Sequence, residues 1–396
     1  MTVGIIGATG YAGAELVRLL SQHPKVSKLI LASVSFEGEA IESVYPNFFG
    51  AVHASLVKPA AVVKEADIVF SALPHGAGEE YAKACIERGV SFIDLSADFR
   101  FDDDEATFTA WYGKPYIYPE LRKRSVYGLP ELNRRRTSEL AAAGPVIIGN
   151  PGCYPTSASL GVFPALAKGK ASPGATIIVD AASGVTGGGR EPSRSFHYPE
   201  CADALAPYKV GAHRHTPEIA RNFSAMSALS AVAGTPPSAV GAPLSATGTP
   251  PAPALIFTPH LAPMNRGILS TIYIPLAAGR ADTTALAGDA ANAAVRPPSK
   301  EIEEKAAGIR ALYADFYRDE PFVRVLPAGV VAATNRVRQS NYCDISVHLD
   351  QSGNTLIVAS AIDNMVKGAA GQAIQNMNII FGFDEKTGLD AIPALF

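Results

Sequence analysis

A glycine-rich loop behind the first apolar run constrains the fold of this chain more than any other feature. Residues 3–6 form a short apolar run typical of a strand, and residues 7–13 read G-A-T-G-Y-A-G, a G-x-x-G-x-x-G spacing. Leucines at helical spacing follow within residues 11–23, up to Pro24. Glycines at such a turn let the backbone approach a pyrophosphate, whose charge the free N–H groups of a helix start bind. The context therefore favours a dinucleotide site over a simple tight turn.

Strand and helix signals keep alternating up to about residue 150. A helix is predicted over residues 79–88. Apolar runs predict further strands at 29–32, 66–72, 91–95 and 146–148. This order favours a parallel sheet with helices on both faces, a Rossmann-type α/β dinucleotide-binding domain over residues 1–150.

The character of the sequence changes after residue 150. Longer strand patterns occupy 175–180, 268–275 and 341–349, and in the last of these apolar and polar residues alternate. Alternation predicts an antiparallel or mixed sheet with one face in water, hence an α+β catalytic domain over residues 151–360. Within it, residues 225–254 form a low-complexity insertion. Residues 362–381 return to helical periodicity, and we expect residues 361–396 to form a C-terminal helical segment that returns to the first domain.

Composition limits the function classes. Of 396 residues 47% are hydrophobic and 18% are charged, so the chain can bury a large core. A net charge of −3 offers no basic excess for nucleic acid. The uncharged stretch 222–265 holds eight prolines, which argues against a membrane span. Four cysteines without a C-x-x-C pair do not predict a disulfide framework, and we expect a cytoplasmic protein.

Cys153 is the candidate nucleophile. Residues 149–156 read G-N-P-G-C-Y-P-T, between an apolar run and an apolar segment with helical character. The dipole and the free N–H groups of a helix start stabilise a thiolate, the reactive form of cysteine. The alternative is a buried structural thiol, which we accept for Cys85 and Cys343, whereas Cys201 is ambiguous.

A cysteine nucleophile needs a base within hydrogen-bond reach. Residues 213–218 read H-R-H-T-P-E, in which Thr216 is a plausible N-cap and Pro217 the first helical residue. We choose His213 as the base and His215 as its neighbour, although the sequence barely separates the two. A solvated turn is the alternative, and two histidines without further ligands do not predict a metal site.

One loop, residues 183–190, is a candidate for binding an anion, and the segment after the second predicted strand bears on the choice between NADP and NAD. Residues 183–190 read S-G-V-T-G-G-G-R, so either they form a flexible hairpin loop or their N–H groups and Arg190 hold an oxyanion. The second strand ends at Ser33 and Ser35 instead of an acidic residue, which favours NADP over NAD. The nearby Glu37, and the lack of a neighbouring arginine in the sequence, keep NAD as the less favoured choice.

Nine segments in this order resemble the N-acetyl-γ-glutamyl-phosphate reductase family of arginine biosynthesis, within the aspartate-semialdehyde dehydrogenase-like superfamily. They span nearly the whole chain except the insertion at 225–254. The segments are G-A-T-G-Y-A-G (7–13), L-P-H-G (73–76), D-L-S-A-D-F-R (94–100), Y-G-L-P-E-L (127–132), G-N-P-G-C-Y-P-T (149–156), S-G-V-T-G-G-G-R (183–190), H-R-H-T-P-E-I (213–219), P-M-N-R-G-I (263–268) and D-N-M-V-K-G-A-A-G-Q-A (363–373).

The resemblance implies NADPH-dependent reduction of N-acetyl-γ-glutamyl phosphate to N-acetylglutamate 5-semialdehyde and phosphate. Cys153 would form a thioester and His213 would move the proton. An exposed sheet face in the second domain would favour a homo-oligomer, a dimer or tetramer. The expected cofactor-binding residues are Gly7, Thr9, Gly10, Tyr11, Gly13, Ser33, Ser35, Ser71, Pro74, Gly184, Asn364, Lys367 and Gly368. The expected substrate-binding residues are Asn150, Ser183, Arg190, Arg214 and His215.

Two other functions stay open. A reductase of the same architecture would act on another acyl phosphate, either aspartyl phosphate or a carrier-linked aminoadipyl phosphate. The segments H-R-H-T-P-E-I and Y-G-L-P-E-L argue against aspartyl phosphate. A non-catalytic NADP-sensing protein is the other alternative, and the joint presence of Cys153 and His213 argues against it.

Overall fold

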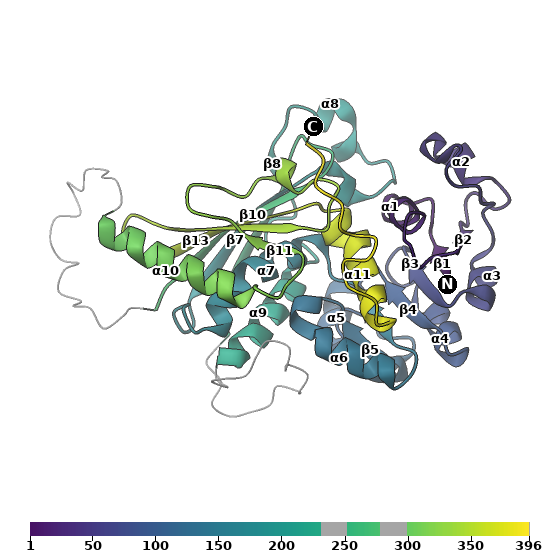
Figure 1. The fold of residues 1–396 in the computed structure, drawn as a ribbon, viewed down its shortest axis with the longest axis horizontal. Helices are drawn as coiled ribbons and strands as arrows, with labels where there is room; N and C mark the ends of the chain where they lie inside the picture. Colours follow the sequence, from purple (N-terminus) through teal and green to yellow (C-terminus); the bar gives the residue numbers. More distant parts are fainter. Residues whose placement is uncertain (231–251, 278–298, 396) are drawn as a thin grey trace.

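The computed structural model describes residues 1–230, 252–277 and 299–395 of the chain, which build two sheets with their helices (Figure 1). Within these residues the first sheet has six strands, all parallel, in the order β2-β1-β3-β4-β6-β5. Its strands are β1 (Thr2–Ile6), β2 (Lys28–Ala32), β3 (Ile68–Ser71), β4 (Ser91–Asp94), β5 (Ser125–Tyr127) and β6 (Ile147–Gly149). The strand order reverses between β1 and β3, the place in such sheets where a crevice for a ligand opens.

Apolar side chains explain the first sheet and its helices. The strands are buried along almost their whole length, as expected for parallel strands covered on both faces. Helix α1 begins at Tyr11 and ends at Leu20, three residues before the predicted end, and buries Leu16, Val17 and Leu20. The remaining helices of this part are α2 (Ile41–Val44), η1 (Pro46–Phe48), α3 (Pro59–Glu65), α4 (Glu79–Glu87), α5 (Glu105–Tyr112), η2 (Pro119–Arg124) and α6 (Pro130–Ala142).

The second sheet is mixed. Among the described residues it has seven strands in the order β11-β12-β13-β10-β7-β9-β8, in which β7/β9 and β11/β12 pair parallel and the other neighbours antiparallel. The strands are β7 (Thr176–Ser183), β8 (Ala206–Pro207), β9 (Ala254–Leu261), β10 (Ile268–Pro275), β11 (Val323–Val325), β12 (Cys343–Leu349) and β13 (Thr355–Ile362). The α/β plus α+β architecture expected from the sequence is thus confirmed.

One face of this second sheet packs on three helices. Helices α7 (Cys153–Ala167), α9 (Thr216–Ser230) and α10 (Lys300–Phe316) share a hydrophobic core with the inward side chains of the strands. On β7 every second residue is buried, and on the opposite face Ile178 and Ile256 are 39% and 51% exposed. The short elements that link these parts are η3 (Val185–Gly188), η4 (Arg194–Phe196), α8 (Tyr198–Cys201) and η7 (Thr334–Arg336).

Strand β12 does not have the wet face that its alternating sequence predicts. Asp344 and Ser346 are both 1% exposed, because the segment before β12 covers them. Arg324 donates a hydrogen bond of 2.6 Å to Asp344, and Ser346 accepts one from the backbone of Ala332. Polar residues in an alternating strand can therefore face a second, polar-lined layer instead of water.

The C-terminal segment packs against the first sheet and α1. The π-helical turn η8 (Val366–Ala370) leads into α11 (Gly371–Ile380), which lies between the two sheets in Figure 1. Val366 and Met377 belong to the same hydrophobic cluster as Val3 and Leu16 of the first sheet and α1. The tail therefore completes the core of the N-terminal part.

The low-complexity stretch falls only partly on described residues. Residues 225–230 continue α9 and residue 254 begins β9, whereas residues 231–251 lie outside the described part.

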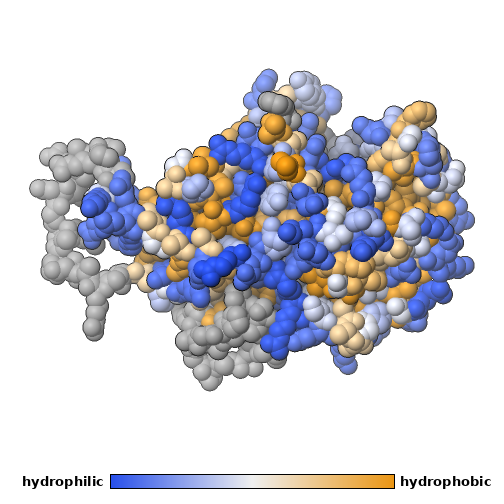
Figure 2. All heavy atoms as spheres, in the orientation of Figure 1, coloured by the Kyte–Doolittle hydropathy of each residue, from blue (hydrophilic) through white to orange (hydrophobic). Residues whose placement is uncertain are grey.

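In Figure 2 polar side chains lie between apolar patches over both parts of the visible face. No helix in the described ranges combines the length and the apolar character needed to cross a membrane.

Candidate active site

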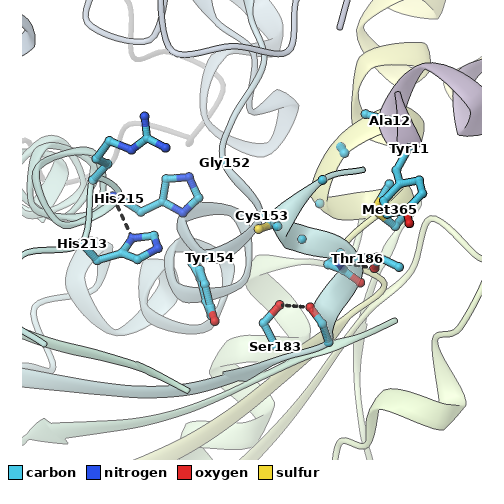
Figure 3. Close-up of a pocket in the computed structure, with 18 of the residues that line it drawn as sticks. Tyr11, Ala12, Gly152, Cys153, Tyr154, Ser183, Thr186, His213, His215 and Met365 are labelled. Atoms are coloured by element: carbon cyan, nitrogen blue, oxygen red, sulfur yellow. Dashed lines mark hydrogen bonds between the residues drawn. The ribbon is translucent and has the colours of Figure 1, made fainter. Parts of the chain in front are cut away.

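A cavity of about 570 Å³ opens where the two parts of the molecule meet, and Cys153 lies in it. In Figure 3 the histidines lie on one side of Cys153, and Tyr11 and Met365 on the other. Ten of the twenty residues predicted from the sequence line this cavity, so the fold brings half of the predicted site residues together here. They are Tyr11, Asn150, Cys153, Ser183, Gly184, His213, Arg214, His215, Asn364 and Gly368.

Cys153 is the first residue of α7, directly behind the N-cap Gly152. Two glycines leave room at this corner. A Cβ on Gly368 would lie 2.8 Å from the Cβ of Cys153, and one on Gly152 would lie 2.5 Å from Nε2 of His215. Burial raises the pKa of the Cys153 thiol to about 11, although the backbone N–H groups of Cys153 and Tyr154 and the charge of Arg100 lower it. The helix start alone therefore does not make a thiolate at neutral pH, and ionisation requires a base.

His213 and His215 supply two neutral imidazoles beside Cys153. Their ring centroids lie 4.9 Å apart, and both rings contact Tyr154 edge-on. Burial is the main cause that lowers the pKa of His213 to about 4, with Lys209 and Arg214 contributing. Burial, His213 and Arg100 hold the pKa of His215 well below its ordinary value. Both rings are therefore uncharged at neutral pH.

The hydrogen bonds distinguish the two rings. Nδ1 of His213 accepts a hydrogen bond of 3.1 Å from the backbone N–H of His215, so in the neutral ring Nε2 carries the proton. Nε2 of His215 lies 3.5 Å from Nη1 of Arg100, which can only donate, so that nitrogen presents a lone pair. Nδ1 of His215 has no hydrogen-bond partner among the described residues.

A buried ion pair that we did not predict connects the segment before Cys153 with α9. Arg100 donates 2.8 Å to the carbonyl of Asn150 and 3.2 Å to Glu218 in the first turn of α9. Glu218 also accepts 2.8 Å hydrogen bonds from the N–H of Gly152 and the hydroxyl of Tyr127. Both side chains of the ion pair are almost fully buried, at 6% and 1% exposure. The signal for them was present as a lone arginine and a lone glutamate in the motifs D-L-S-A-D-F-R and H-R-H-T-P-E.

The glycine-rich loop forms a cradle suited to a dinucleotide. Gly7 has φ +83°, and a Cβ there would lie 2.7 Å from the carbonyl oxygen of Ala72. A Cβ on Gly13 would overlap the carbonyl oxygen of Gly7, so only glycine lets α1 approach the loop. The hydroxyls of Thr9 and Ser33 lie 2.9 Å apart at the end of β2. The residues present thus fit a pyrophosphate and its ribose at the strand-order reversal.

Other predicted cofactor residues surround this cradle. Gly10 is the N-cap of α1, and Ser71 ends β3 with a buried hydroxyl that has no partner among the described residues. Pro74 follows in the exposed loop behind β3, and Ser35 is exposed behind β2.

Three predicted residues have other contacts. Lys367 is fully buried and donates 2.7 Å to Glu131 and 2.9 Å to Gln375, so the structure does not bring it to the cavity. Arg190 donates 3.0 Å to the carbonyl of Thr9, beside the glycine-rich loop and not beside Cys153. Asn364 lines the cavity, but its amide already bonds to Gly267 and Thr186.

Further residues of the cavity wall were not predicted as site residues, although Tyr154 and His75 stand in motifs quoted from the sequence. Tyr154 accepts a 3.1 Å hydrogen bond from Tyr208 and donates to the carbonyl of His260. Lys209 has φ +46°, a strained value for a residue with a side chain, and lines the cavity beside Arg214. Burial lowers the pKa of His75 to about 3.

Comparisons with known proteins agree with this geometry. Residues 2–140 match the family model described as semialdehyde dehydrogenase, NAD binding domain, and residues 153–364 match that described as semialdehyde dehydrogenase, dimerisation domain. Among solved structures, aspartate semialdehyde dehydrogenase II of Vibrio cholerae, complexed with ASA, has a TM-score of 0.65 at 16% identity and covers 96% of this chain and 98% of its own. Aspartate semialdehyde dehydrogenase with NADP from Candida albicans has a TM-score of 0.59 at 16% identity, with 96% and 98% coverage. These structures show the fold.

Curated relatives are much more similar in sequence. N-acetyl-gamma-glutamyl-phosphate reductase of Clostridium kluyveri is 44% identical over 394 residues, and the alignment covers 100% of this chain and 99% of the relative. The proteins of the same name from Brachyspira hyodysenteriae and Desulforudis audaxviator are 44% and 43% identical, with the same coverage. The chain therefore carries a nicotinamide-dinucleotide-binding domain of the semialdehyde dehydrogenase type and belongs to the N-acetyl-γ-glutamyl-phosphate reductase family.

Proposed function

We propose that the protein reduces N-acetyl-γ-glutamyl phosphate with NADPH to N-acetylglutamate 5-semialdehyde and phosphate, a step of arginine biosynthesis. The observation that carries the proposal is Cys153 at the start of α7, in one cavity with two neutral histidines and next to a dinucleotide cradle. The full-length identity of 44% to reductases of this name supports the choice of substrate.

The cofactor would lie between the glycine-rich loop and Cys153. Gly7, Gly10 and Gly13 leave space for its pyrophosphate, and Ser33 stands where an NAD site usually has an acidic residue, which favours NADP. When bound, the dinucleotide supplies the hydride. Gly184 and Gly368 line the path from this cradle to Cys153.

The two histidines divide the proton chemistry in this proposal. The sequence favoured His213 as the base, but Nε2 of His215 is unprotonated, has only a long contact of 3.5 Å with Arg100, and lies against Gly152, next to Cys153. We assign His215 as the acceptor of the thiol proton. His213, with its proton on Nε2, is a hydrogen-bond donor to the oxyanion that forms on the substrate carbonyl.

The proton and the leaving group balance in the two half-reactions. The Cys153 thiolate attacks the acyl carbon, phosphate leaves, and the thiol proton passes through His215 to the departing phosphate. The bound dinucleotide would supply a hydride to the same carbon, and the Nε2–H of His213 would stabilise the resulting oxyanion until the carbon–sulfur bond breaks and the aldehyde forms. The thiolate regains a proton from solvent. The N–H groups of Cys153 and Tyr154 face the sulfur and stabilise each thiolate stage, whereas Pro155 has no N–H to contribute.

Cations of the second domain suit an anionic substrate. Arg214 and Lys209 line the cavity close enough to lower the pKa of His213. A phosphate and a carboxylate would both be attracted to these charges. Asn150 has a buried Oδ1 without a partner among the described residues and so can accept a hydrogen bond from the substrate or the cofactor.

The test is a panel of aldehydes oxidised in the presence of phosphate and followed by dinucleotide absorbance. N-acetylglutamate 5-semialdehyde with NADP should give the highest kcat/KM, and Cys153→Ser should lower the rate by at least about 10⁴-fold while NADPH still binds. The matched control Cys201→Ser should keep the activity, because Cys201 lies outside the cavity. Preference for aspartate semialdehyde or a carrier-linked substrate would refute the substrate assignment, and turnover by Cys153→Ser would refute the nucleophile.

We also propose a cytoplasmic homo-oligomer. All four cysteines are free thiols, which suits a reducing compartment. The face of the second sheet opposite α7, α9 and α10 exposes Ile178 and Ile256, within the region that matches the dimerisation-domain model. Ile256→Glu should lower the mass in light scattering, whereas Ile392→Glu, at an 86% exposed position in the C-terminal segment, should not. An unchanged mass for Ile256→Glu would exclude this face as the contact.

A further inference from the structure

Arg190 belongs to the second domain in sequence but lies on the dinucleotide cradle. It follows η3, in the segment between β7 and α8, which reaches toward α1 in Figure 1. Its Nη1 donates 3.0 Å to the carbonyl of Thr9 inside the glycine-rich loop. Its guanidinium lies 5.2 Å from the ring centroid of Phe36 and 5.0 Å from that of Tyr45. The arginine therefore faces the region just behind β2.

This region is where the adenosine ribose of a dinucleotide lies in such folds. A carboxylate usually binds the ribose hydroxyls of NAD there, and a neighbouring arginine accommodates the 2′-phosphate of NADP. Here the end of β2 carries Ser33, which is buried and bonded to Thr9. The nearest acidic residue, Glu37, is half exposed and lies 3.6 Å from Nζ of Lys58. The strand end therefore offers hydroxyl groups and no buried carboxylate.

The guanidinium has donors to spare at this place. One of its five N–H groups bonds to Thr9, and Tyr45 also donates to the same carbonyl at 2.9 Å. A guanidinium binds phosphate through two parallel hydrogen bonds, and its planar face packs well against aromatic rings. Phe36 and Tyr45 thus hold the side chain, and although the Tyr45 hydroxyl also forms a hydrogen bond with it, further N–H groups of the guanidinium can bind a ligand.

We propose that Arg190 binds the 2′-phosphate of NADP and is the residue that makes the protein select NADP over NAD, an inference that rests on the proposed NADPH-dependent function. The sequence suggested no arginine for this task because none lies close to Ser33 along the chain. In the structure this arginine comes from the second domain. A 2′-phosphate would then bridge the two domains and fix the loop that ends at Arg190 beside the glycine-rich loop.

The test measures binding without turnover. Calorimetric Kd values of adenosine 2′,5′-bisphosphate and of 5′-AMP differ only by the 2′-phosphate, so their ratio isolates that group. Arg190→Gln should weaken adenosine 2′,5′-bisphosphate and NADPH about 10- to 100-fold and leave 5′-AMP and NADH within about threefold. The affinity of Arg190→Lys for these 2′-phosphorylated ligands should lie between those of the wild-type protein and Arg190→Gln. Lysine keeps the positive charge but lacks the planar guanidinium with its two parallel N–H donors.

Arg194 provides the control. It lies in the same segment, is 91% exposed and pairs only with Glu200 at 3.6 Å in the described part of the chain, so Arg194→Gln removes an equal charge without touching the cradle. The proposal is overturned if Arg190→Gln leaves the ratio of the two nucleotide Kd values unchanged, or if it weakens all four ligands equally. It is also overturned if Arg194→Gln weakens the 2′-phosphorylated ligands as much as Arg190→Gln does. If the wild-type protein binds NADH as tightly as NADPH, the NADP preference of the proposed function is refuted, and so is the role of Arg190 in it. If the wild-type protein prefers NADPH and Arg190→Gln keeps that preference, only the role of Arg190 is refuted.

Discussion

Helices α1 and α7 begin in nearly the same way and in very different surroundings. Each follows a strand of the parallel sheet, and their N-caps Gly10 and Gly152 have φ/ψ of −74°/164° and −67°/154° without a side-chain cap. The start of α1 is open, since Tyr11 is 38% exposed, whereas α7 is buried at every residue from Tyr154 to Leu166. An open helix start can bind the anion of a ligand, but a buried one raises the cost of charge on its own side chain.

The buried start therefore needs a partner that the open one does not need. The pKa of the Cys153 thiol is raised to about 11 despite the helix dipole, and two neutral histidines stand beside it. The motif alone predicts a position for an anion, and the burial around it decides whether that anion forms without a base.

The largest expected effect removes the base at the buried start. His215→Asn should lower the rate of thioester formation at pH 7 by about 10²- to 10⁴-fold, and His213→Asn should lower it less, because it removes a donor and not the acceptor. The loss in His215→Asn should shrink as the pH rises toward the raised thiol pKa of about 11, where Cys153 ionises unaided. Iodoacetamide alkylation of Cys153 across pH measures this directly.

The same pH series tests whether the histidine side chains are neutral near pH 7. The pKa of His215, the assigned proton acceptor, is held well below its ordinary value, chiefly by burial, so the wild-type profile should show no limb near pH 6.5. Such a limb, or an alkylation plateau near neutral pH, would mean that the buried helix start carries a thiolate on its own.

The next effect concerns the ion pair behind Gly152. Arg100→Met leaves the charge of Glu218 buried without its cation and should lower the free energy of unfolding by about 3–5 kcal/mol. Arg135→Met is the matched control, because Arg135 and Glu139 are 62% and 58% exposed and should contribute less than about 1 kcal/mol. Urea unfolding curves give both values, and equal losses would show that burial does not set the importance of the pair.

The smallest effect compares the two N-caps themselves. Both have extended backbone that alanine adopts, but a Cβ on Gly10 meets only the Gly7 carbonyl at 3.5 Å, whereas one on Gly152 meets His215 at 2.5 Å. Gly152→Ala should lower kcat about 10- to 100-fold by displacing the imidazole, with NADPH affinity unchanged. Gly10→Ala should change kcat by less than about threefold, because the added Cβ meets only the Gly7 carbonyl and not the histidines. If the two variants lost kcat equally, the tight contact at Gly152 would not matter.

The sequence predicted the first sheet well because its buried strands are short apolar runs next to glycines. Strands β1, β2, β3, β4 and β6 all lie at the predicted places. Strand β5 has only three residues, too few for a pattern. Strand β9 contains Pro259, a residue that argues against a strand inside a sheet, and it pairs with β7 and β8 nonetheless.

The site was predictable where chemistry shows in a short motif. Cys153, His213 and His215 stand in motifs whose turn residues place them, and the fold brings them into one cavity. Long-range partners were not predictable. Lys367 meets Glu131 across 236 residues, Arg100 meets Glu218 across 118, and Arg190 meets Thr9 across 181. Charged residues in glycine-rich or helical motifs have no preferred partner until the domains are packed.

The most direct test of the account is to trap the acyl group on the enzyme. The protein is mixed with N-acetyl-γ-glutamyl phosphate and NADP⁺, which fills the cofactor site without donating hydride, and is then quenched in acid and digested for mass spectrometry. The account predicts one N-acetylglutamyl group on the peptide that contains Cys153, removed by hydroxylamine and absent from Cys153→Ser. An acyl group on another residue, or turnover with NADPH and no acylated Cys153, would contradict it.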